Sequence, residues 1–257
     1  MPQHATLSVV VPAYNEAATL EQIIEKLLAV NNVFEVVIVD DHSGDDTPAI
    51  AQRLIERFEN VRYVRHDKNQ GKTAALRTGF SMTTGDIVIV QDADLEYDPS
   101  EIPEVIRPIL EGYADVVYGS RFMVKRAARV LYFYHYLANK LLTFLSNALT
   151  NLNFTDVETC YKAFRGEIIR NMTINSSGFG FEIEVTAKTA KLKCAVYEVP
   201  ISYYGRTYEQ GKKITYKDGF AALYYIFRYN LFCGLRSSFS TTPELEAGRP
   251  RLLRSER

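Results

Sequence analysis

Four short runs rich in valine and isoleucine constrain the fold of this chain more than any other feature. "LSVVVPA", "EVVIVDD" and "DIVIVQD" are apolar at successive positions and end at turn or acidic residues, and "VRYVRH" is a shorter run of this kind. Between them, residues 16–30, 48–58 and 69–83 are predicted helices. Continuously apolar strands that alternate with helices are typical of a parallel sheet covered on both faces. The sequence therefore predicts an α/β fold with a mostly parallel sheet, to which "ADVVYGSR" adds a fifth strand.

Polar residues gather at the end of each predicted strand, and in such sheets ligands bind beyond the carboxyl ends of the strands. The pairs are Asn15 and Glu16, Asp40 and Asp41, His66 and Asp67, and Asp92 and Asp94. No Gly-x-Gly-x-x-Gly motif follows the first strand, which disfavours a dinucleotide-dependent dehydrogenase. The sequence thus predicts a binding site of another kind at this edge.

Gly71-Lys72-Thr73 has the form of the end of a phosphate-binding P-loop. A P-loop needs another glycine five positions earlier so that consecutive backbone N–H groups surround a phosphate, and here that position is His66. The tripeptide therefore does not predict a P-loop nucleotide hydrolase.

Asp92 and Asp94 follow a buried strand two positions apart, and Glu96 lies two positions further on. Two carboxylates directed at one point repel each other unless a cation lies between them. Oxygen-only ligands suit Mg²⁺ or Mn²⁺, usually shared with a substrate diphosphate. The pattern predicts a divalent metal site.

The composition argues against two classes of function. The 257 residues carry a formal net charge of −1, so no basic surplus indicates nucleic-acid binding. No stretch reaches the roughly 18 consecutive apolar residues of a transmembrane helix. The two longest candidates, 130–149 and 219–235, are rich in Tyr, Phe and Leu but are interrupted by polar residues. No signal peptide is recognisable in the sequence.

Five segments, in this order, resemble the inverting family 2 glycosyltransferases of GT-A fold: "VVVPAYNEAATL", "VIVDDHSGDDT", "NQGKTAALRTGF", "QDADLEYDP" and "YGSRF". The later segments "TDVETCYKAFRGEII", "GFGFEIEVTAKTAKL" and "VPISYYGRTYEQGKKI" are similar to the branch that contains dolichol-phosphate mannose synthases and polyprenyl-phosphate glucosyltransferases. Together the likenesses run to about residue 230. They imply transfer of a hexose from a UDP or GDP sugar to a polyprenyl phosphate.

The resemblance implies roles for the donor-side residues. Pro12, Tyr14 and Glu16 would line the nucleoside pocket, and Asp41 would contact the base or ribose. Lys72 would begin a helix that flanks the donor.

The resemblance also assigns the metal and diphosphate groups. Asp92 and Asp94, the latter catalytic, would bind the metal and the donor diphosphate, with Glu96 as a further ligand position. A flexible basic loop that closes over the diphosphate would contain the catalytic Arg206 with Lys212 and Lys213.

The acceptor can be argued from its charge. A phosphate monoester has a second pKa of about 6, so a lipid phosphate attacks at neutral pH without a general base. A sugar hydroxyl needs a base, and Glu182 is the candidate. The chain has no tryptophan, which excludes the Gln-x-x-Arg-Trp signature of processive synthases. The residues favour a phosphate acceptor and leave a saccharide hydroxyl open.

A phosphate acceptor needs cations, and "GSRFMVKRAAR" supplies them just before the aromatic segment 130–149. Arg121 is the first candidate for the acceptor phosphate and for a catalytic role, with Arg126 or Arg129 as the second. Basic residues beside an amphipathic aromatic helix fit a helix in the plane of a membrane surface. A core helix with a solvated basic flank fits the residues equally, and the resemblance favours the membrane helix.

The expected organisation is a donor-binding half (1–125), an acceptor and membrane-interface half of the same domain (126–236), and a disordered tail (237–257). We expect a peripheral protein on the cytoplasmic face of the membrane. Many relatives continue into transmembrane helices, so a membrane-anchor subunit is a further candidate partner. Two other classes stay as rivals: a sugar-nucleotide pyrophosphorylase, which lacks its glycine-rich loop here, and a non-catalytic nucleotide-sugar sensor.

Overall fold

Seven strands form the central sheet in the order β3-β2-β1-β4-β6-β5-β7. The computed structural model describes residues 5–123, 132–206 and 216–243. The strands are β1 (Leu7–Ala13), β2 (Val33–Asp40), β3 (Val61–Arg65), β4 (Ile87–Val90), β5 (Val116–Ser120), β6 (Lys162–Arg165) and β7 (Val196–Pro200). The helices are α1 (Leu20–Leu28), α2 (Thr47–Arg57), α3 (Lys72–Met82), the 3₁₀ helix η1 (Pro99–Glu101), α4 (Ile102–Leu110), α5 (Phe133–Thr150), α6 (Gly166–Asn171), α7 (Phe181–Leu192), α8 (Tyr216–Leu231) and α9 (Leu235–Ser238).

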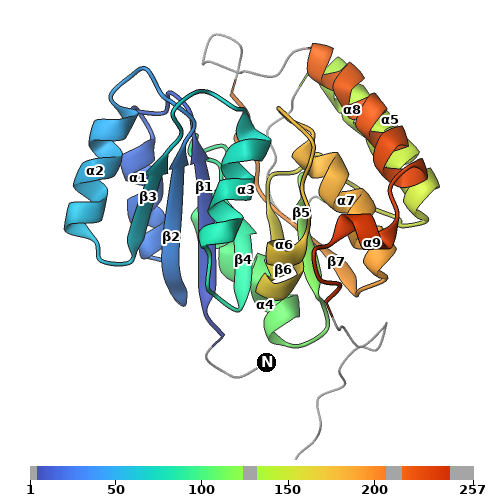
Figure 1. Cartoon of the computed structure of the whole chain (residues 1–257), viewed down its shortest axis with the longest axis horizontal. Coiled ribbons are helices and arrows are strands. Elements are labelled where there is room, and N and C mark those ends of the chain that lie inside the picture. The colour runs from blue at the N-terminus through green and yellow to red at the C-terminus, as the bar shows by residue number, and fades with distance from the viewer. Residues whose placement is uncertain (1–4, 124–131, 207–215, 244–257) are drawn as a thin grey trace, which may run out of the picture.

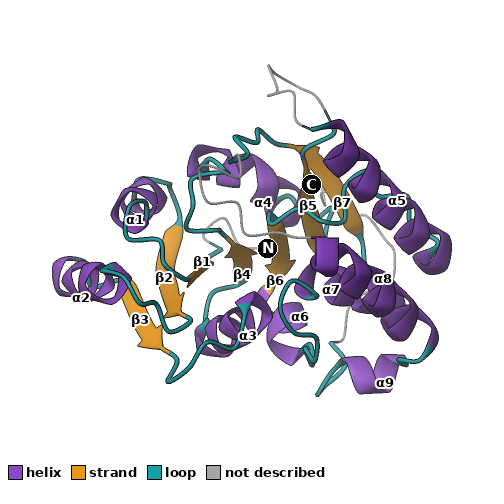
Figure 2. Cartoon of the chain, turned by 90° about the horizontal axis from the view of Figure 1, so that it is seen from above, coloured by secondary structure: helices purple, strands orange, loops and turns teal. Residues whose placement is uncertain are grey.

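The sheet is layered between helices, as the sequence predicts. Helices α1 and α4 lie on one face, and α3, α6 and α7 lie on the other (Figure 1, Figure 2). The central strands are buried on both faces, and no residue of β4 is exposed. This burial explains why these strands are apolar at every position, and it confirms the predicted α/β class.

Strand β6 reverses the direction of the chain within the sheet. It is antiparallel to β4 and β5, whereas every other neighbouring pair is parallel. The five strands expected from the sequence are confirmed, but β6, with the sequence "KAFR", is too short and too polar to be predicted. Because β6 is antiparallel, its amino end lies at the edge where the carboxyl ends of β4 and β5 lie. The residues before β6 therefore also reach the predicted site.

A buried carboxylate fixes the strands at the opposite edge. Glu35 accepts hydrogen bonds from the Ser8 hydroxyl at 2.7 Å and from the backbone N–H and hydroxyl of Thr84 at 2.6 and 2.9 Å. Burial opposes ionisation of Glu35, but the bonds from Thr84 and Ser8, with Arg62, hold its pKa below the usual value. These bonds tie β1 and β2 to the turn before β4.

Helices α5 and α8 pack against each other and against α7 at one end of the sheet (Figure 1, Figure 2). Within the described ranges, no helix is both long and apolar enough to cross a membrane. The chain beyond α8 returns to the body of the protein, where Phe239 is buried and pairs with Met172. The first part of the tail that was expected to be disordered therefore packs against the fold, and its remainder, 244–257, lies outside the described residues.

Gly79 sets how closely α3 approaches the sheet. A Cβ atom at this position would lie 2.3 Å from Cγ1 of Val10 and 3.3 Å from Cγ2 of Val39. We expect Gly79→Ala to lower the free energy of unfolding by about 1–3 kcal/mol through overpacking. For a chain of this size, each kcal/mol lowers the Tm by roughly 2–4 °C. Thermal and urea unfolding measure the change.

Gly219→Ala in α8 is the matched control, because a Cβ there meets nothing within 4 Å. Replacing a helical glycine by alanine in open space gains up to about 1 kcal/mol. The two glycines are thus expected to respond with opposite sign. Equal responses would contradict the close-packing argument for Gly79.

Candidate active site

One large cavity, of 1370 Å³, lies at the carboxyl ends of the parallel strands. Every predicted site residue that the structure describes lines it: Pro12, Tyr14, Glu16, Asp41, Lys72, Asp92, Asp94, Glu96, Arg121 and Arg206. Its walls also include the first turns of α5 and residues of α8. The predicted Arg126, Arg129, Lys212 and Lys213 lie outside the described residues. The residues predicted from the strand ends thus lie together around one cavity, and their roles stay predictions.

Three loops at this edge have strained backbone. Asn15, His42 and Leu95 have φ angles of 53°, 65° and 60°, in the left-handed region. Residues other than glycine adopt that region at a cost, and such residues cluster at functional sites. The three lie in the loops after β1, β2 and β4, next to residues that line the cavity, whereas Asn32, Asn151 and Lys193 have positive φ elsewhere.

Asp92, Asp94 and Glu96 follow β4, and each of them forms an ion pair with a lysine or arginine side chain. Lys72 Nζ lies 2.9 Å from Asp92 Oδ1, and Arg206 Nη2 lies 2.7 Å from Asp94 Oδ2. Burial, followed by the negative charges of Asp92 and Glu96, raises the pKa of Asp94 to about 7, although Arg206 opposes this shift. The cavity thus holds more carboxylate charge at this point than one arginine neutralises.

Glu96 holds the segment that follows β7. Its carboxylate accepts hydrogen bonds from the Tyr203 hydroxyl at 2.8 Å and from the backbone N–H of Arg206 at 2.7 Å. The Arg206 guanidinium also reaches Glu16 at 3.3 Å. Tyr203 was not identified from the sequence as a site residue, and its role depends on a contact between segments 107 residues apart. In this structure Glu96 positions Arg206, and its metal-binding role stays a prediction.

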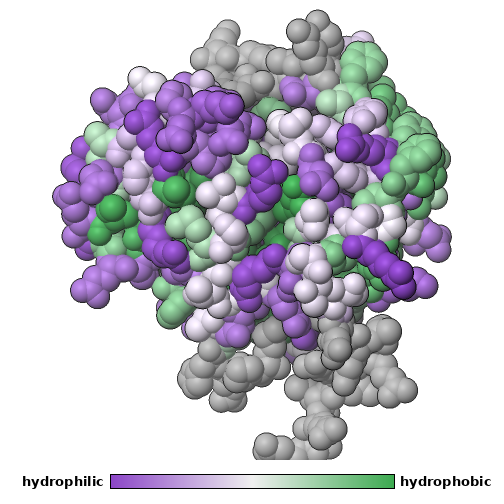
Figure 3. Space-filling model, in the orientation of Figure 1, coloured by the Kyte–Doolittle hydropathy of each residue, from purple (hydrophilic) through white to green (hydrophobic). Residues whose placement is uncertain are grey.

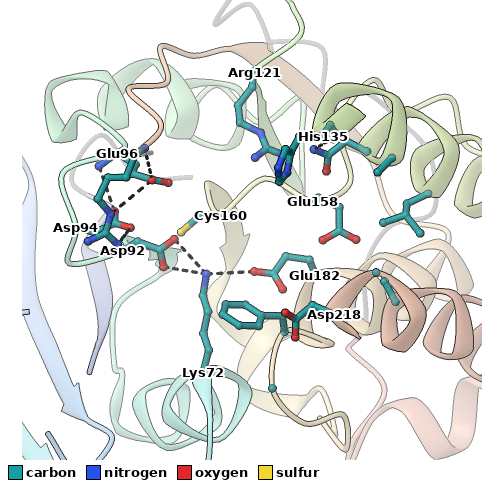
Figure 4. Close-up of a pocket in the computed structure, with 18 of the residues that line it drawn as sticks. Lys72, Asp92, Asp94, Glu96, Arg121, His135, Glu158, Cys160, Glu182 and Asp218 are labelled. Atoms are coloured by element: carbon teal, nitrogen blue, oxygen red, sulfur yellow. Dashed lines mark hydrogen bonds and ion pairs between the residues drawn. The ribbon is translucent and has the colours of Figure 1, made fainter. Parts of the chain in front are cut away.

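Gly71 and Lys72 form the turn that begins α3. Gly71 has φ of 87°, which favours glycine, and a Cβ there would meet the backbone of Gly178 at 3.3 Å. Lys72 Nζ joins Asp92 to Glu182, whose Oε1 is 3.3 Å away (Figure 4). Burial opposes the charge on Lys72, but Asp92 and Glu182 hold its pKa well above the usual value. The lysine of the Gly-Lys-Thr tripeptide thus forms a part-buried ion-pair bridge.

Asp41 binds the backbone of the turn that precedes Lys72. Its carboxylate accepts hydrogen bonds from the backbone N–H groups of Gln70 at 2.9 Å and Gly71 at 2.6 Å, and it lies 2.7 Å from His66 Nδ1. In this structure Asp41 positions the loop before Lys72. Its contact with a base or ribose stays a prediction.

Arg121 forms a two-bond ion pair with a buried aspartate that was not identified from the sequence. Its Nε and Nη2 donate to the two carboxylate oxygens of Asp156, each at 2.7 Å. The guanidinium also lies 5.2 Å from the ring centroid of Tyr203. Despite burial, Arg121 holds the pKa of Asp156 below the usual value. Arg121 is therefore fixed in the wall of the cavity, and its acceptor role stays a prediction.

A second pair of acids, Glu158 and Glu182, lies in the middle of the cavity (Figure 4). Burial and the nearby charge of Glu182 raise the pKa of Glu158 to about 7. Lys162, beneath them, donates to the carbonyl groups of Val157 and Thr159, and burial lowers its pKa to about 8. The spacing of Asp156 and Glu158 repeats that of Asp92 and Asp94. This repeated spacing was the one sequence signal for Asp156 and Glu158. The two residues reach the site only because β6 runs antiparallel to its neighbours.

The mouth of the cavity is apolar. On α5, Tyr134 is 80% exposed and Phe133 is 66% exposed, and on α8 Phe220 is 70% exposed. Figure 3 shows apolar side chains along the outer side of the molecule where these two helices lie. Lys140 of α5 lies at the inner side, 4.5 Å from the ring centroid of Phe122. The cavity thus connects an acidic end with an aromatic surface.

The model of the family described as glycosyl transferase family 2 matches residues 8–173. The dolichol-phosphate mannosyltransferase of Pyrococcus furiosus is 32% identical over 228 residues, which cover 86% of this chain and 63% of that protein. An undecaprenyl-phosphate 4-deoxy-4-formamido-L-arabinose transferase of Photorhabdus laumondii is 32% identical over 171 residues, which cover 65% of this chain and 51% of that protein. The chain thus spans between half and two thirds of the length of these curated relatives.

Among solved structures, glucosyl-3-phosphoglycerate synthase from Mycobacterium tuberculosis is similar in fold. Its complex with Mn²⁺, UDP-glucose and phosphoglyceric acid superposes with a TM-score of 0.68 at 22% identity, covering 88% of this chain and 79% of that one. This likeness confirms the predicted GT-A fold. The family model covers more than half of the sequence, including β1 to β6. The chain therefore belongs to glycosyl transferase family 2.

Proposed function

We propose that this protein is an inverting transferase that moves a hexose from a UDP or GDP sugar to a polyprenyl phosphate, with the help of Mg²⁺ or Mn²⁺. The observation that carries the proposal is the single cavity, which runs from paired carboxylates and cations to an exposed aromatic surface. Such a cavity suits a charged donor at one end and a lipid acceptor at the other. The names of the relatives from Pyrococcus furiosus and Photorhabdus laumondii support a lipid-phosphate acceptor.

The donor end has the chemistry that a nucleotide diphosphate needs. Transfer leaves negative charge on the departing diphosphate, and fixed cations in a buried site stabilise that charge. Lys72 and Arg206 supply such cations, and both are held by carboxylates. Pro12, Tyr14 and Glu16 line the adjoining wall, where the nucleoside would bind.

The residues present fit a divalent cation. Asp92, Asp94 and Glu96 offer only oxygen ligands, which Mg²⁺ and Mn²⁺ prefer. In the part of the chain that the structure describes, no three acidic, His or Cys side chains are already grouped around one ion position. Asp92 and Asp94 would hold the metal beside the diphosphate, with Glu96 as a third ligand position. The metal would supply Lewis-acid stabilisation of the leaving group.

The acceptor end fits a phosphate on a lipid. Arg121 presents a guanidinium at the cavity wall, and Asp156 fixes its orientation. A lipid phosphate is largely dianionic at neutral pH, so it attacks the anomeric carbon without a base. Arg126 and Arg129, outside the described residues, stay candidates for the same phosphate, and Lys212 and Lys213 stay candidates for the diphosphate.

A saccharide hydroxyl is the second candidate acceptor, because Glu182 lies in the cavity and could serve as a base. One of its oxygens is engaged by Lys72. Assays with a short polyprenyl phosphate and with a saccharide distinguish the two acceptors.

Two halves of one domain would divide the work, with residues 1–125 binding the donor and 126–236 facing the acceptor and the membrane. The exposed aromatic residues of α5 and α8 would lie in the surface of a bilayer, as Tyr- and Phe-rich amphipathic helices do. The protein would then be peripheral, with or without an anchoring subunit.

Asp94→Asn tests the donor site. Removing the charge leaves the fold in place but removes a ligand of the metal, and we expect transfer to fall by about 10²–10³-fold. Chelation of divalent ions should cause a similar loss that Mn²⁺ restores. The assay follows labelled sugar from UDP-glucose or GDP-mannose into a short polyprenyl phosphate. Glu104→Gln, on the surface, is the control, and full activity of Asp94→Asn would refute the metal assignment.

Arg121→Lys tests the acceptor site. Lysine keeps the charge but cannot form the two bonds to Asp156 that fix the guanidinium in the cavity wall, so we expect the KM for polyprenyl phosphate to rise about tenfold. The donor KM should change less than twofold. Arg107→Lys, in an exposed pair on α4, is the matched control. An unchanged acceptor KM in a folded variant would move the phosphate site away from Arg121.

Phe144→Ser and Phe227→Ser test the membrane surface, since both side chains are exposed on α5 and α8 and neither lines the cavity. Burying one phenylalanine contributes about 1.5–3 kcal/mol, so we expect each change to weaken vesicle binding roughly tenfold or more. Co-sedimentation with vesicles of equal parts phosphatidylcholine and phosphatidylglycerol measures this. Phe34→Ser, at an exposed position of β2, should bind like the parent. Equal loss in all three variants would contradict a surface made by α5 and α8.

A further inference from the structure

The carboxyl groups of Glu158 and Glu182 have no assigned task in the reaction described above. They come from distant segments, because Glu158 precedes β6 and Glu182 lies in the first turn of α7. In Figure 4 both lie to the right of Asp92, with His135 above them and Asp218 below. They therefore line the cavity together with the donor carboxylates and the helices of the acceptor end.

Each of the two residues has an oxygen that lacks a partner. Glu182 is 5% exposed, and its Oε1 is bound by Lys72, but its Oε2 is buried without a hydrogen bond from any described residue. Glu158 is partly exposed to the cavity, and its Oε1 is also buried and unpartnered among the described residues. Buried acceptors without donors cost free energy, and native proteins rarely leave them so. The two oxygens thus lack donors that a bound ligand could provide.

We propose that Glu158 and Glu182 form the sugar subsite of the cavity, where their unpartnered oxygens accept hydrogen bonds from hydroxyl groups of the donor's hexose. This inference rests on the proposed function and names the part of the site that distinguishes one sugar from another.

The charges around the pair favour a neutral polyol. A phosphate group would be repelled by two carboxyl groups that face it. A further cation would be stabilised only weakly here, because Lys72 already contacts Glu182 and the charge of Lys162 already acts on both acids. Hydroxyl groups donate hydrogen bonds to carboxylates without adding charge, and such charge-assisted bonds are stronger than neutral ones.

The position of the pair agrees with this assignment. Lys72 contacts both Glu182 and Asp92, so a single side chain separates the subsite from the diphosphate end of the cavity. On the other side, Glu158 lies two residues from Asp156, which holds Arg121. A sugar that passes from the donor to the acceptor phosphate therefore stays within reach of both acids.

Glu158→Gln and Glu182→Gln test the subsite by binding alone, without turnover. Calorimetry with Mn²⁺ compares UDP-glucose and GDP-mannose with UDP and GDP. We expect each variant to bind the recognised nucleotide sugar about tenfold more weakly, since a charge-assisted bond is replaced by a neutral one. Binding of the free diphosphate should change less than twofold. Glu104→Gln is the control, and a cooperative thermal unfolding transition in each variant verifies folding.

Donors with single hydroxyl groups of the hexose replaced by hydrogen identify the contact. The parent protein should lose about tenfold in affinity when the contacted hydroxyl is removed, and the matching variant should lose less than twofold, as coupled partners do. Equal losses in parent and variant would overturn the subsite. So would equal weakening of diphosphate and nucleotide sugar, or a loss of kcat alone in Glu182→Gln, which would indicate a base.

The outcomes separate this inference from the proposed function. A parent protein that binds no nucleotide sugar would overturn both. A parent that binds one but transfers nothing to polyprenyl phosphate would overturn the proposed acceptor, while the binding comparison would still decide the role of Glu158 and Glu182.

Discussion

The ion-pair bridge of Lys72 joins the end of β4 to the start of α7 at the centre of the cavity. Its ammonium group lies between Asp92, at the end of β4, and Glu182, at the start of α7. A buried charge is tolerated only when it is paired, and removing one partner of such a group is costly. Gly71 and Gly178 bring the two backbones close enough for this contact. The cavity floor thus depends on Lys72 together with the hydrogen bonds from Thr73 to the Gly178 carbonyl.

Arg206 plays the equivalent part at the other end of the acidic cluster. It contacts Glu16 and Asp94, and its backbone is held by Glu96. The two cations pair with the carboxylates at the strand ends but leave an excess of negative charge there. An incoming diphosphate with its metal would exchange one set of ion pairs for another, so charges would stay paired throughout binding. This arrangement lets a strongly charged site form in a stable fold.

Much of this structure follows from the sequence, because parallel strands buried on both faces are apolar at every position. That pattern gave β1 to β5 and the edge at which Asp92 and Asp94 lie. The ion-pair partners of the site residues could not be predicted from the sequence. Pairs such as Arg121 with Asp156 join segments that only tertiary packing brings together. The direction of β6 was equally hidden, because "KAFR" is neither continuously apolar, as the equally short β4 is, nor long enough to show a period. Glu158 was therefore missed although it stands in the sequence in the same pattern as the predicted acids.

Helix α5 lines the cavity with one side and is exposed on the other. Tyr136 and Lys140 line the cavity, while Leu137 and Phe144 are exposed, and no further layer of the described chain covers that outer side. The cavity is thus enclosed here by a wall one helix thick. Force applied to the outer side of such a wall is transmitted directly to the inner one. A change in the packing of the outer side of α5 would therefore act on the cavity with no intervening layer of the described chain.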